Sequence, residues 1–225
     1  MDTVGAWKDA GVRKVIVGIT PSYGPLAKRQ MDTVVAGGLE LEAYTYLYYP
    51  NNLSPFMLGA LDSRPVKRLW LDFEDSGAPE DVAKVTNWIR MAVAEAKEQL
   101  GTRIGIYTAS WWWTPFTGNC TEFSDLPLWV AQYDYEPSLQ FNPFGGWNKC
   151  EMKQYRGTTE FHDYSVDMNY YEEDAMTPEL QAALAELRQA VESLKNEGQL
   201  QRMVISAMLD GKYTDAKNML IYVGA

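Results

Sequence analysis

The sequence predicts an α/β fold, a (β/α) barrel whose last helices have been lost. Seven segments of the 225-residue chain have the pattern of strands, and helical segments alternate with them through the first half of the chain. Repeated strand–helix units give parallel strands joined by right-handed crossovers, and a closed ring of such strands is a barrel. No long helix separates the last three strands, so we expect the end of the barrel to consist of strands and turns.

Each element is recognised by its apolar residues and by the residues that end it. Helices are expected over 2–11, 26–36, 54–62 and 79–100, and strands over 12–19, 39–49, 66–73, 103–108, 126–133, 151–155 and 165–170. The helix over 79–100 has the strongest pattern. Pro79 stands at its start, apolar residues recur three or four positions apart from Val82 to Leu100, and Gly101 ends it.

Closure of the barrel normally needs an eighth strand. The helix over 2–11 should follow a strand, and no segment precedes it in the sequence. We therefore expect the first strand to be missing or to lie upstream of Met1. The barrel is assigned to residues 1–175, and residues 176–225 are expected to form a helical C-terminal extension.

The extension begins with a strong helix start. Thr177 is a helix cap, Pro178 takes the first helical position and Glu179 lies in the first turn. Apolar residues then follow at alternating spacings of four and three: Leu180, Leu184, Leu187, Val191 and Leu194. Shorter helices are expected near 199–209 and 214–222. One interpretation is that the extension packs on the barrel or on itself, and the other is self-association or docking to a larger assembly.

The composition excludes several classes of protein. The net charge of −10 disfavours nucleic acid as a partner, and no apolar run reaches the about 18 residues of a membrane span. A single histidine and two cysteines exclude a multi-histidine metal centre and a four-cysteine zinc site, and phosphate-binding glycine motifs are absent, so we expect no cofactor. Cys120 and Cys150 are expected to form a disulfide, which implies an oxidising compartment, or to remain two unreactive thiols.

Two carboxylates provide the main chemical signal. Asp72 and Glu74 are two positions apart at the end of the strand over 66–73, so their side chains share one face. The C-terminal ends of barrel strands form the active site, and a carboxylate pair there can divide into a protonated acid and an anion. Glycoside cleavage needs that division. The alternative is that these acids are merely solvated or cap a turn.

A second polar pair and many aromatic residues accompany the acids. Asp167 and Asn169 also share a face near a strand end, and they could bind sugar hydroxyls, orient the first pair or serve a turn. The chain has 8 Trp and 14 Tyr, which suit carbohydrate binding or simply fill a core. Those nearest the predicted site are Tyr44, Tyr46, Tyr48, Tyr107, Trp111, Trp112, Trp113, Trp129 and Tyr133.

Several segments, in this order, resemble glycoside hydrolase family 25, the Chalaropsis-type lysozymes. They span about residues 7–171 and comprise Trp7-Lys8-Asp9-Ala10-Gly11-Val12, Ala36-Gly37-Gly38-Leu39, Ala43-Tyr44-Thr45-Tyr46, Leu71-Asp72-Phe73-Glu74, Gly105-Ile106-Tyr107-Thr108, Leu128-Trp129-Val130-Ala131-Gln132-Tyr133, Gln154-Tyr155 and Val166-Asp167-Met168-Asn169. The resemblance implies a (β/α)5β3 barrel. It also implies hydrolysis of the β-1,4 bond between N-acetylmuramic acid and N-acetylglucosamine in peptidoglycan, outside the cell or in association with a phage.

The resemblance also suggests roles for individual residues. Glu74 matches the general acid/base, Asp72 the carboxylate that assists it, and Asp167 a further acid of the site. The expected substrate-binding residues are Tyr44, Tyr46, Tyr107, Trp112, Trp129, Tyr133, Gln154 and Asn169. The family's first strand carries an aspartate that this sequence lacks. A non-catalytic glycan-binding or virion/assembly module on a degraded barrel is therefore an alternative, as is a barrel glycosidase acting on chitin-like chains.

Overall fold

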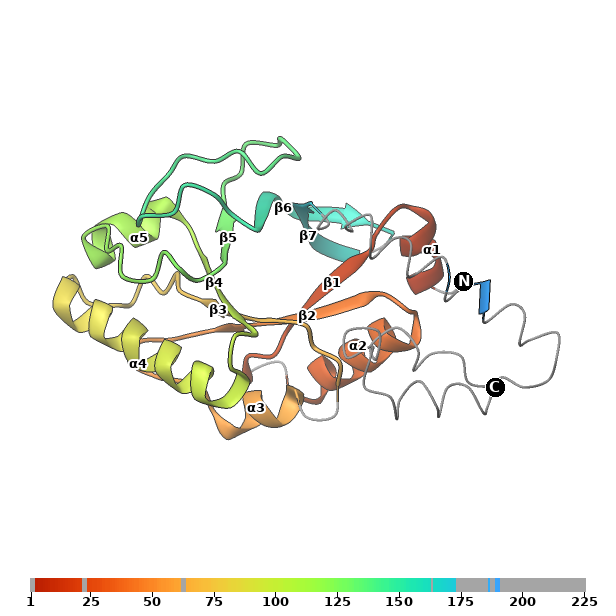
Figure 1. Cartoon of the computed structure of the whole chain (residues 1–225), viewed down its shortest axis with the longest axis horizontal. Coiled ribbons are helices and arrows are strands. Elements are labelled where there is room, and N and C mark those ends of the chain that lie inside the picture. The colour runs from red at the N-terminus through yellow and green to blue at the C-terminus, as the bar shows by residue number, and fades with distance from the viewer. Residues whose placement is uncertain are drawn as a thin grey trace. The chain divides into compact units, whose positions relative to one another are not determined.

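A computed structural model describes residues 3–21, 24–61, 64–162 and 164–172, together with residues 186, 189 and 190. The chain divides into two units, Met1–Glu172 and Glu173–Ala225, and the strands and helices labelled in Figure 1 belong to the first. The helices expected over 177–225 lie outside the described residues, apart from those three positions.

Seven strands form one sheet in which spatial order follows chain order. They are β1 (Lys14–Gly18), β2 (Glu40–Tyr46), β3 (Leu69–Asp72), β4 (Ile104–Thr108), β5 (Leu128–Ala131), β6 (Met152–Phe161) and β7 (Tyr164–Tyr171). Neighbouring strands from β1 to β6 are parallel, as expected. Strands β6 and β7 are antiparallel and form a hairpin longer than the sequence predicted.

The sheet curls without closing. Its order places β1 and β7 at the two edges, and no pairing joins these strands among the residues the structure describes. The closed (β/α)5β3 barrel is therefore not confirmed, although the described residues contain seven strands, the number predicted. At one point the edges approach each other, because Lys14 Nζ of β1 lies 4.4 Å from the ring centroid of Tyr171 in β7.

Helices connect the strands of the first half of the chain. They are α1 (Thr3–Asp9), α2 (Gly24–Ala36), α3 (Pro55–Leu61), α4 (Val82–Leu100) and α5 (Ser110–Thr117). Helices α2, α3 and α4 lie on the same side of the strands β1 to β4 (Figure 1). Beyond α5 the chain runs through long loops to β5 and β6, which agrees with the expectation that helices crowd the first half.

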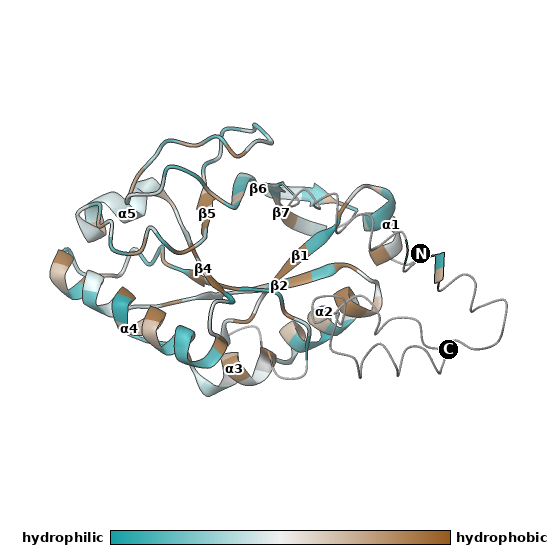
Figure 2. Ribbon diagram, in the orientation of Figure 1, coloured by the Kyte–Doolittle hydropathy of each residue, from teal (hydrophilic) through white to brown (hydrophobic). Residues whose placement is uncertain are grey.

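Helix α4 shows how its sequence determines its ends. Asp81 caps it by accepting a hydrogen bond from the Lys84 backbone N–H at 3.1 Å, so the helix begins at Val82 rather than at Pro79. Gly101 ends it with a φ of 61°, a value that favours glycine. One face, which includes Val85 and Ile89, is buried, and the ribbon alternates between apolar and polar residues along its length (Figure 2).

Side-chain alternation along the strands creates two apolar layers. In β3 and just after it, Leu69, Leu71 and Phe73 belong to the large core that includes residues of the helices. Trp70, between them, belongs to a second cluster with Tyr107, Trp129 and Met152 on the inner face of the curled sheet. Asp72 is two residues beyond Trp70, so its side chain is directed to that inner face.

Gly105 makes room for the indole of this inner cluster. A Cβ atom at Gly105 would overlap the Trp70 side chain, whereas a Cβ at Gly59 in α3 would meet no atom within 4 Å. Gly105→Ala is therefore expected to lower the free energy of unfolding by about 1–3 kcal/mol. Gly59→Ala, the matched control, is expected to leave it unchanged or raise it by up to about 1 kcal/mol. Urea unfolding of both variants tests this, and equal stabilities would contradict the packing argument.

An ion-pair network lies at the opposite end of the inner cluster from Asp72. Lys14 Nζ lies 2.8 Å from a carboxylate oxygen of Glu42 and 2.9 Å from one of Glu40. The Trp70 indole N–H donates to Glu42 at 2.6 Å. The Glu42 side chain is 1% exposed and that of Lys14 is 7% exposed. Burial opposes the charge on Lys14, but the two glutamates outweigh it and raise the pKa of the lysine.

Candidate active site

The acidic pair lies where β3 ends. Asp72 is the last residue of β3 and is only 3% exposed. Its Oδ1 atom has no hydrogen-bond partner in the structure. Burial, with the neighbouring charge of Glu74 as a second cause, raises the pKa of Asp72 well above its usual range. A buried carboxylate with an unpartnered oxygen is suited to receive a hydrogen-bond donor from a ligand.

Glu74 is two residues beyond Asp72 and is half-buried. Burial raises the pKa of Glu74, and the negative charge of Asp167 on β7 raises it further. The pKa of Tyr107 on β4 is also raised, by burial and then by the charges of Glu74 and Asp72. The charges of Asp72, Glu74 and Asp167, the three predicted site acids, thus act on neighbouring groups of the candidate site.

The loop that carries Glu74 is held by Asp75. The Asp75 carboxylate accepts hydrogen bonds from the backbone N–H groups of Tyr49 and Gly77, each at 2.9 Å. Its backbone carbonyl accepts one from the Trp112 indole, also at 2.9 Å. Sequence analysis missed Asp75, although an aspartate two residues before a glycine is a common turn signal.

Polar and aromatic groups from β4 to β7 form a connected network beside the acids. The hydroxyls of Tyr107 and Tyr133 both donate to Gln154 Oε1, at 2.7 and 2.8 Å. Gln154 Nε2 donates to Asp167 at 3.0 Å. The Trp129 indole donates to Asn169 Oδ1 at 2.8 Å. These residues, all predicted for the site, lie together.

Other aromatic residues near the site are more exposed to solvent. Tyr44 packs edge-on against Trp129 with 6.2 Å between ring centroids. The ring centroids of Tyr46 and Tyr48 are 4.5 Å apart. Tyr48 is 54% exposed and Tyr133 is 56% exposed. Of the aromatic residues predicted to bind substrate, Tyr44, Tyr46 and Tyr133 are thus at least partly accessible.

Trp112 is a correction to the predicted set. It is completely buried, and its ring stacks on Phe116 in the same helix with centroids 5.1 Å apart. Trp113 is completely buried as well, whereas Trp111 is 59% exposed. The helical periodicity of α5 turns these neighbouring side chains in different directions. Trp112 therefore packs in the protein and does not offer its face to a substrate.

The expected disulfide between Cys120 and Cys150 is also wrong. Both cysteines are free. The Cys150 thiol donates to the Leu139 carbonyl at 3.3 Å, and burial raises the pKa of this thiol to about 11. The second prediction for this pair, two unreactive thiols, agrees with the structure of Cys150, because thiolates rather than thiols are the reactive species.

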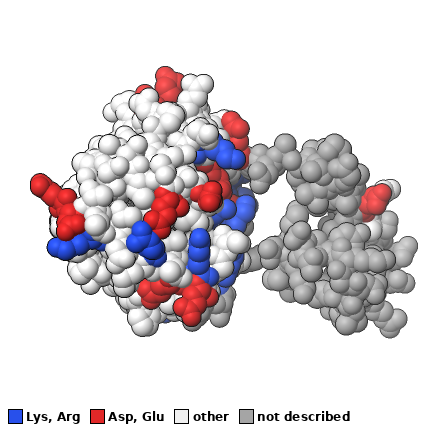
Figure 3. Space-filling view, turned by 60° about the vertical axis from the view of Figure 1, so that its left-hand side comes forward, with Lys and Arg blue, Asp and Glu red and all other residues white. Residues whose placement is uncertain are grey.

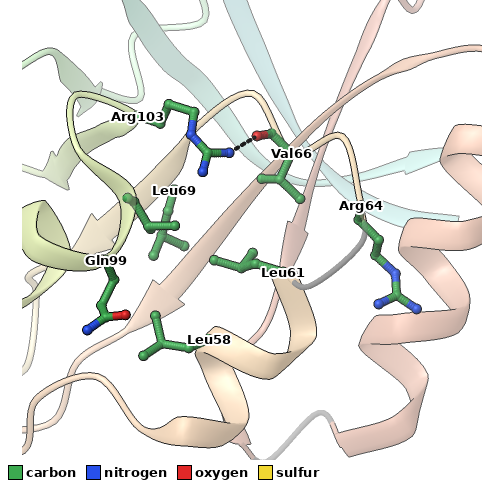
Figure 4. A pocket seen from close by; sticks show the side chains of 8 residues that line it. Leu58, Leu61, Arg64, Val66, Leu69, Gln99 and Arg103 are labelled. Carbon is green, nitrogen blue, oxygen red and sulfur yellow. Dashed lines mark hydrogen bonds between the residues drawn. The ribbon is translucent and has the colours of Figure 1, made fainter. Parts of the chain in front are cut away.

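A separate cavity lies away from the candidate site. A pocket of about 310 Å³ lies where β3 and β4 begin, at the other end of these strands, and is lined by Leu58, Leu69, Arg103 and neighbouring residues (Figure 4).

One face of the molecule shows acidic and basic side chains intermixed (Figure 3). Among the described residues there is no cluster of three potential metal ligands, and no helix is long and apolar enough to cross a membrane.

Two carboxyl groups at the C-terminal ends of parallel strands in a curled sheet suit glycoside hydrolysis. The model of the family Glycosyl hydrolases family 25 matches residues 2–164. The chain therefore belongs to glycoside hydrolase family 25.

The curated relatives include lysozymes. The chain is 32% identical over 147 residues to Probable GH family 25 lysozyme 3 of Dictyostelium discoideum, a match that covers 60% of this chain and 30% of that protein. It is 38% identical over 110 residues to Counting factor 50 of the same organism, covering 46% of this chain and 35% of that protein. The matches thus span about a third of these relatives' length.

A solved structure supports the fold. The muramidase from Trichobolus zukalii aligns with a TM-score of 0.64 and 21% identity, and the alignment covers 76% of this chain and 88% of that one. At this identity the likeness supports the curled α/β fold and leaves the roles of individual residues to be argued from the site.

Proposed function

We propose that this protein is a lysozyme that cleaves the β-1,4 bond between N-acetylmuramic acid and N-acetylglucosamine in the glycan strand of peptidoglycan. The observation that carries the proposal is a pair of carboxyl groups, Asp72 at the end of β3 and Glu74 two residues beyond it, with the charge of Glu74 acting on Asp72. Their environments differ, since Asp72 is 3% exposed whereas Glu74 is half-buried. Different environments allow two carboxyl groups to take different roles.

Glu74 is the general acid and base in this proposal. Its raised pKa keeps a proton on the carboxyl group, and Glu74 gives that proton to the glycosidic oxygen as the bond from this oxygen to the anomeric carbon breaks. The same carboxylate later removes a proton from water, and the resulting hydroxide attacks the anomeric carbon. Glu74 thereby regains its proton, and the sugar is released with the configuration it had in the polymer.

Asp72 assists through the acetamido group of the substrate. The carbonyl oxygen of that group attacks the anomeric carbon as the leaving oxygen departs, and its N–H becomes more acidic as positive charge develops. The unpartnered Oδ1 of Asp72 accepts this N–H. The positive charge that develops there favours the ionised form of Asp72, which burial disfavours in the free protein, and the carboxylate stabilises that charge. The water that Glu74 activates then opens the cyclic intermediate. A substrate without the acetamido group would leave Asp72 buried without a donor.

The exposed aromatic rings supply contacts for sugar faces. Tyr46 and Tyr48 lie at the end of β2, and Tyr133 follows β5, so the rings flank the strand ends where the acids lie. Aromatic rings present flat apolar surfaces that suit the C–H faces of pyranoses. A peptidoglycan substrate places the protein's action on the cell wall, outside the cell or in association with a phage.

Product analysis tests the proposed function. Purified peptidoglycan is incubated with the protein, and the released fragments are reduced with borohydride and analysed by mass spectrometry. A muramidase leaves N-acetylmuramic acid at the new reducing ends. N-acetylglucosamine at those ends, or cleavage of chitin oligomers in preference to the wall, would instead indicate a different glycosidase. Binding without new reducing ends would support the non-catalytic module.

The raised pKa of Glu74 also determines the pH dependence that we expect. Glu74 must be protonated to act as the acid, so hydrolysis is lost as the pH rises through its pKa, which lies above the usual glutamate range. Asp167→Asn removes the second cause of that shift and is expected to move the alkaline limb of the rate profile to lower pH. Initial rates of wall hydrolysis across the pH range test this. A limb that moves to higher pH would contradict the role of the Asp167 charge.

A further inference from the structure

Gln154 occupies a central position among the groups of the site. It lies on β6, is 4% exposed and touches side chains that come from three other parts of the sheet. Tyr107 belongs to β4, Tyr133 follows β5 and Asp167 belongs to β7. Sequence analysis assigned Gln154 to substrate binding. Its buried amide, however, already has a protein partner at both of its polar atoms.

The chemistry of these partners fixes the orientation of the amide. An ionised carboxylate only accepts hydrogen bonds, so the atom of Gln154 that faces Asp167 must be the nitrogen, at 3.0 Å. The oxygen then faces the two tyrosines. A carbonyl oxygen has two lone pairs, and the hydroxyls of Tyr107 and Tyr133 supply one donor to each. A flipped amide would place its oxygen against the carboxylate.

Asp167 is correspondingly held at both oxygens. Oδ2 accepts the Gln154 amide, and Oδ1 accepts the Thr158 backbone N–H at 2.7 Å. The Asp167 residue itself is exposed, so packing alone does not hold its carboxylate. The amide of Gln154 is the only side-chain donor to this carboxylate among the described residues.

We propose that Gln154 is a positioning residue, whose amide is oriented by Tyr107 and Tyr133 and holds the Asp167 carboxylate in place at the candidate site. This inference deepens the proposed function, on which its catalytic consequence rests. Gln154 touches neither the glycosidic oxygen nor the anomeric carbon in that mechanism. Its effect passes through the negative charge of Asp167.

Several titratable groups interact with Glu74. They determine how far the Gln154 amide can change the pKa of Glu74. Asp72 lies on the same strand end, Asp167 faces it from β7, and Tyr46, Tyr107 and Tyr133 approach from β2, β4 and the loop after β5. Within the described part of the chain, no lysine or arginine is among the groups that shift the pKa of Glu74. The anchored Asp167 charge therefore acts on Glu74 without a neighbouring cation to offset it.

Titration of Glu74 tests the proposal without requiring activity. The side-chain carboxyl of Glu74 is followed by NMR against pH in the full chain and in Gln154→Met, which keeps the side chain's length and removes both polar atoms. Without the amide donor, the Asp167 carboxylate is no longer held at Oδ2 and its negative charge acts less strongly on Glu74, so the Glu74 midpoint is expected to fall by at least about 0.5 pH units. An unchanged midpoint in a folded Gln154→Met protein would overturn the proposal.

A matched control is Gln132→Met. The Gln132 amide also donates to an aspartate, Asp134, at 2.8 Å, and this pair is not connected to Glu74. The Glu74 midpoint is expected to stay unchanged in this variant. A fall of the same size there would also overturn the specific role of Gln154. If Gln154→Met does not fold, Tyr133→Phe removes one of the two orienting hydroxyls from an exposed ring, and a smaller fall in the midpoint is expected.

Wall hydrolysis by the same variants separates this inference from the proposed function. In Gln154→Met the alkaline limb of the rate profile is expected to move to lower pH, with kcat reduced by about 10-fold and KM changed less than kcat. A shifted NMR midpoint in a chain that never cleaves peptidoglycan would support the positioning role and refute the lysozyme. A normal midpoint in an active enzyme would refute the positioning role alone.

Discussion

Replacing Glu74 by glutamine is expected to reduce the rate of peptidoglycan hydrolysis by at least about 100-fold. Glutamine has nearly the shape of glutamic acid, but it has no proton to give to the leaving oxygen and cannot activate water. Burial and the Asp167 charge raise the pKa of Glu74, and both causes favour the protonated form that the first step needs. The decrease in turbidity of a bacterial wall suspension measures the rate.

Glu80→Gln is the matched control for this variant. Glu80 lies six positions further along the chain, is exposed and has no part in the site. Glu80→Gln makes the same substitution at an exposed position, so any general effect of replacing a glutamate on binding to the wall would appear in both variants. Glu80→Gln is expected to retain the full rate. Equal rates in Glu74→Gln and the unmodified chain would refute the role of Glu74.

Replacing Lys14 by methionine is expected to lower the free energy of unfolding by about 3–5 kcal/mol. The Glu42 side chain is 1% exposed, and Lys14 is its only cationic partner within 4.0 Å among the described residues. Methionine would leave that carboxylate buried with the Trp70 indole as its remaining donor. Removing one member of a buried pair costs far more than the pair contributes, because the other charge stays without compensation. Urea unfolding measures the loss.

Two further variants test whether burial of the ion pair causes the loss of stability in Lys14→Met. Lys67 pairs with Glu40 at 3.0 Å, but its side chain is 61% exposed, so Lys67→Met is expected to change the free energy of unfolding by about 1 kcal/mol or less. Adding Glu42→Gln to Lys14→Met removes the stranded charge and should restore most of the loss, because the amide oxygen still accepts the Trp70 N–H. Similar losses for Lys14→Met and Lys67→Met would contradict this account.

Much of the fold could be predicted because its signals are local. The positions of β1 to β7 follow from apolar runs, and α4 follows from a periodic face closed by Asp81 and Gly101. The ends of elements were less accurate, because an N-cap such as Asp81 is recognised from hydrogen bonds that the sequence does not show. The length of the β6–β7 hairpin was underestimated, since its outer residues are largely polar and give a weak strand pattern.

Residue spacing alone predicts the candidate site only where one strand carries it, and the resemblance supplies its residues from the other strands. Asp72 and Glu74 are neighbours on a face because side chains alternate along any strand. By contrast, the burial of Trp112 depends on Asp75 and Phe116, and the free thiol of Cys150 is held by Leu139. The hydrogen bonds of Trp112 and Cys150 join separate segments that only the packed fold brings together. The rings of Trp112 and Phe116 stack because these residues lie in one helix.

The sequence by itself thus determined the order of the strands, the shared face of the acidic pair and the family to which the segments belong. Only the tertiary structure decided which polar groups are buried, which tryptophans remain accessible, and how Gln154 connects Tyr107, Tyr133 and Asp167. The physical reason is that alternation and periodicity are properties of a few consecutive residues. Burial and hydrogen-bond orientation arise from groups that are far apart in the chain and meet only when the sheet has curled.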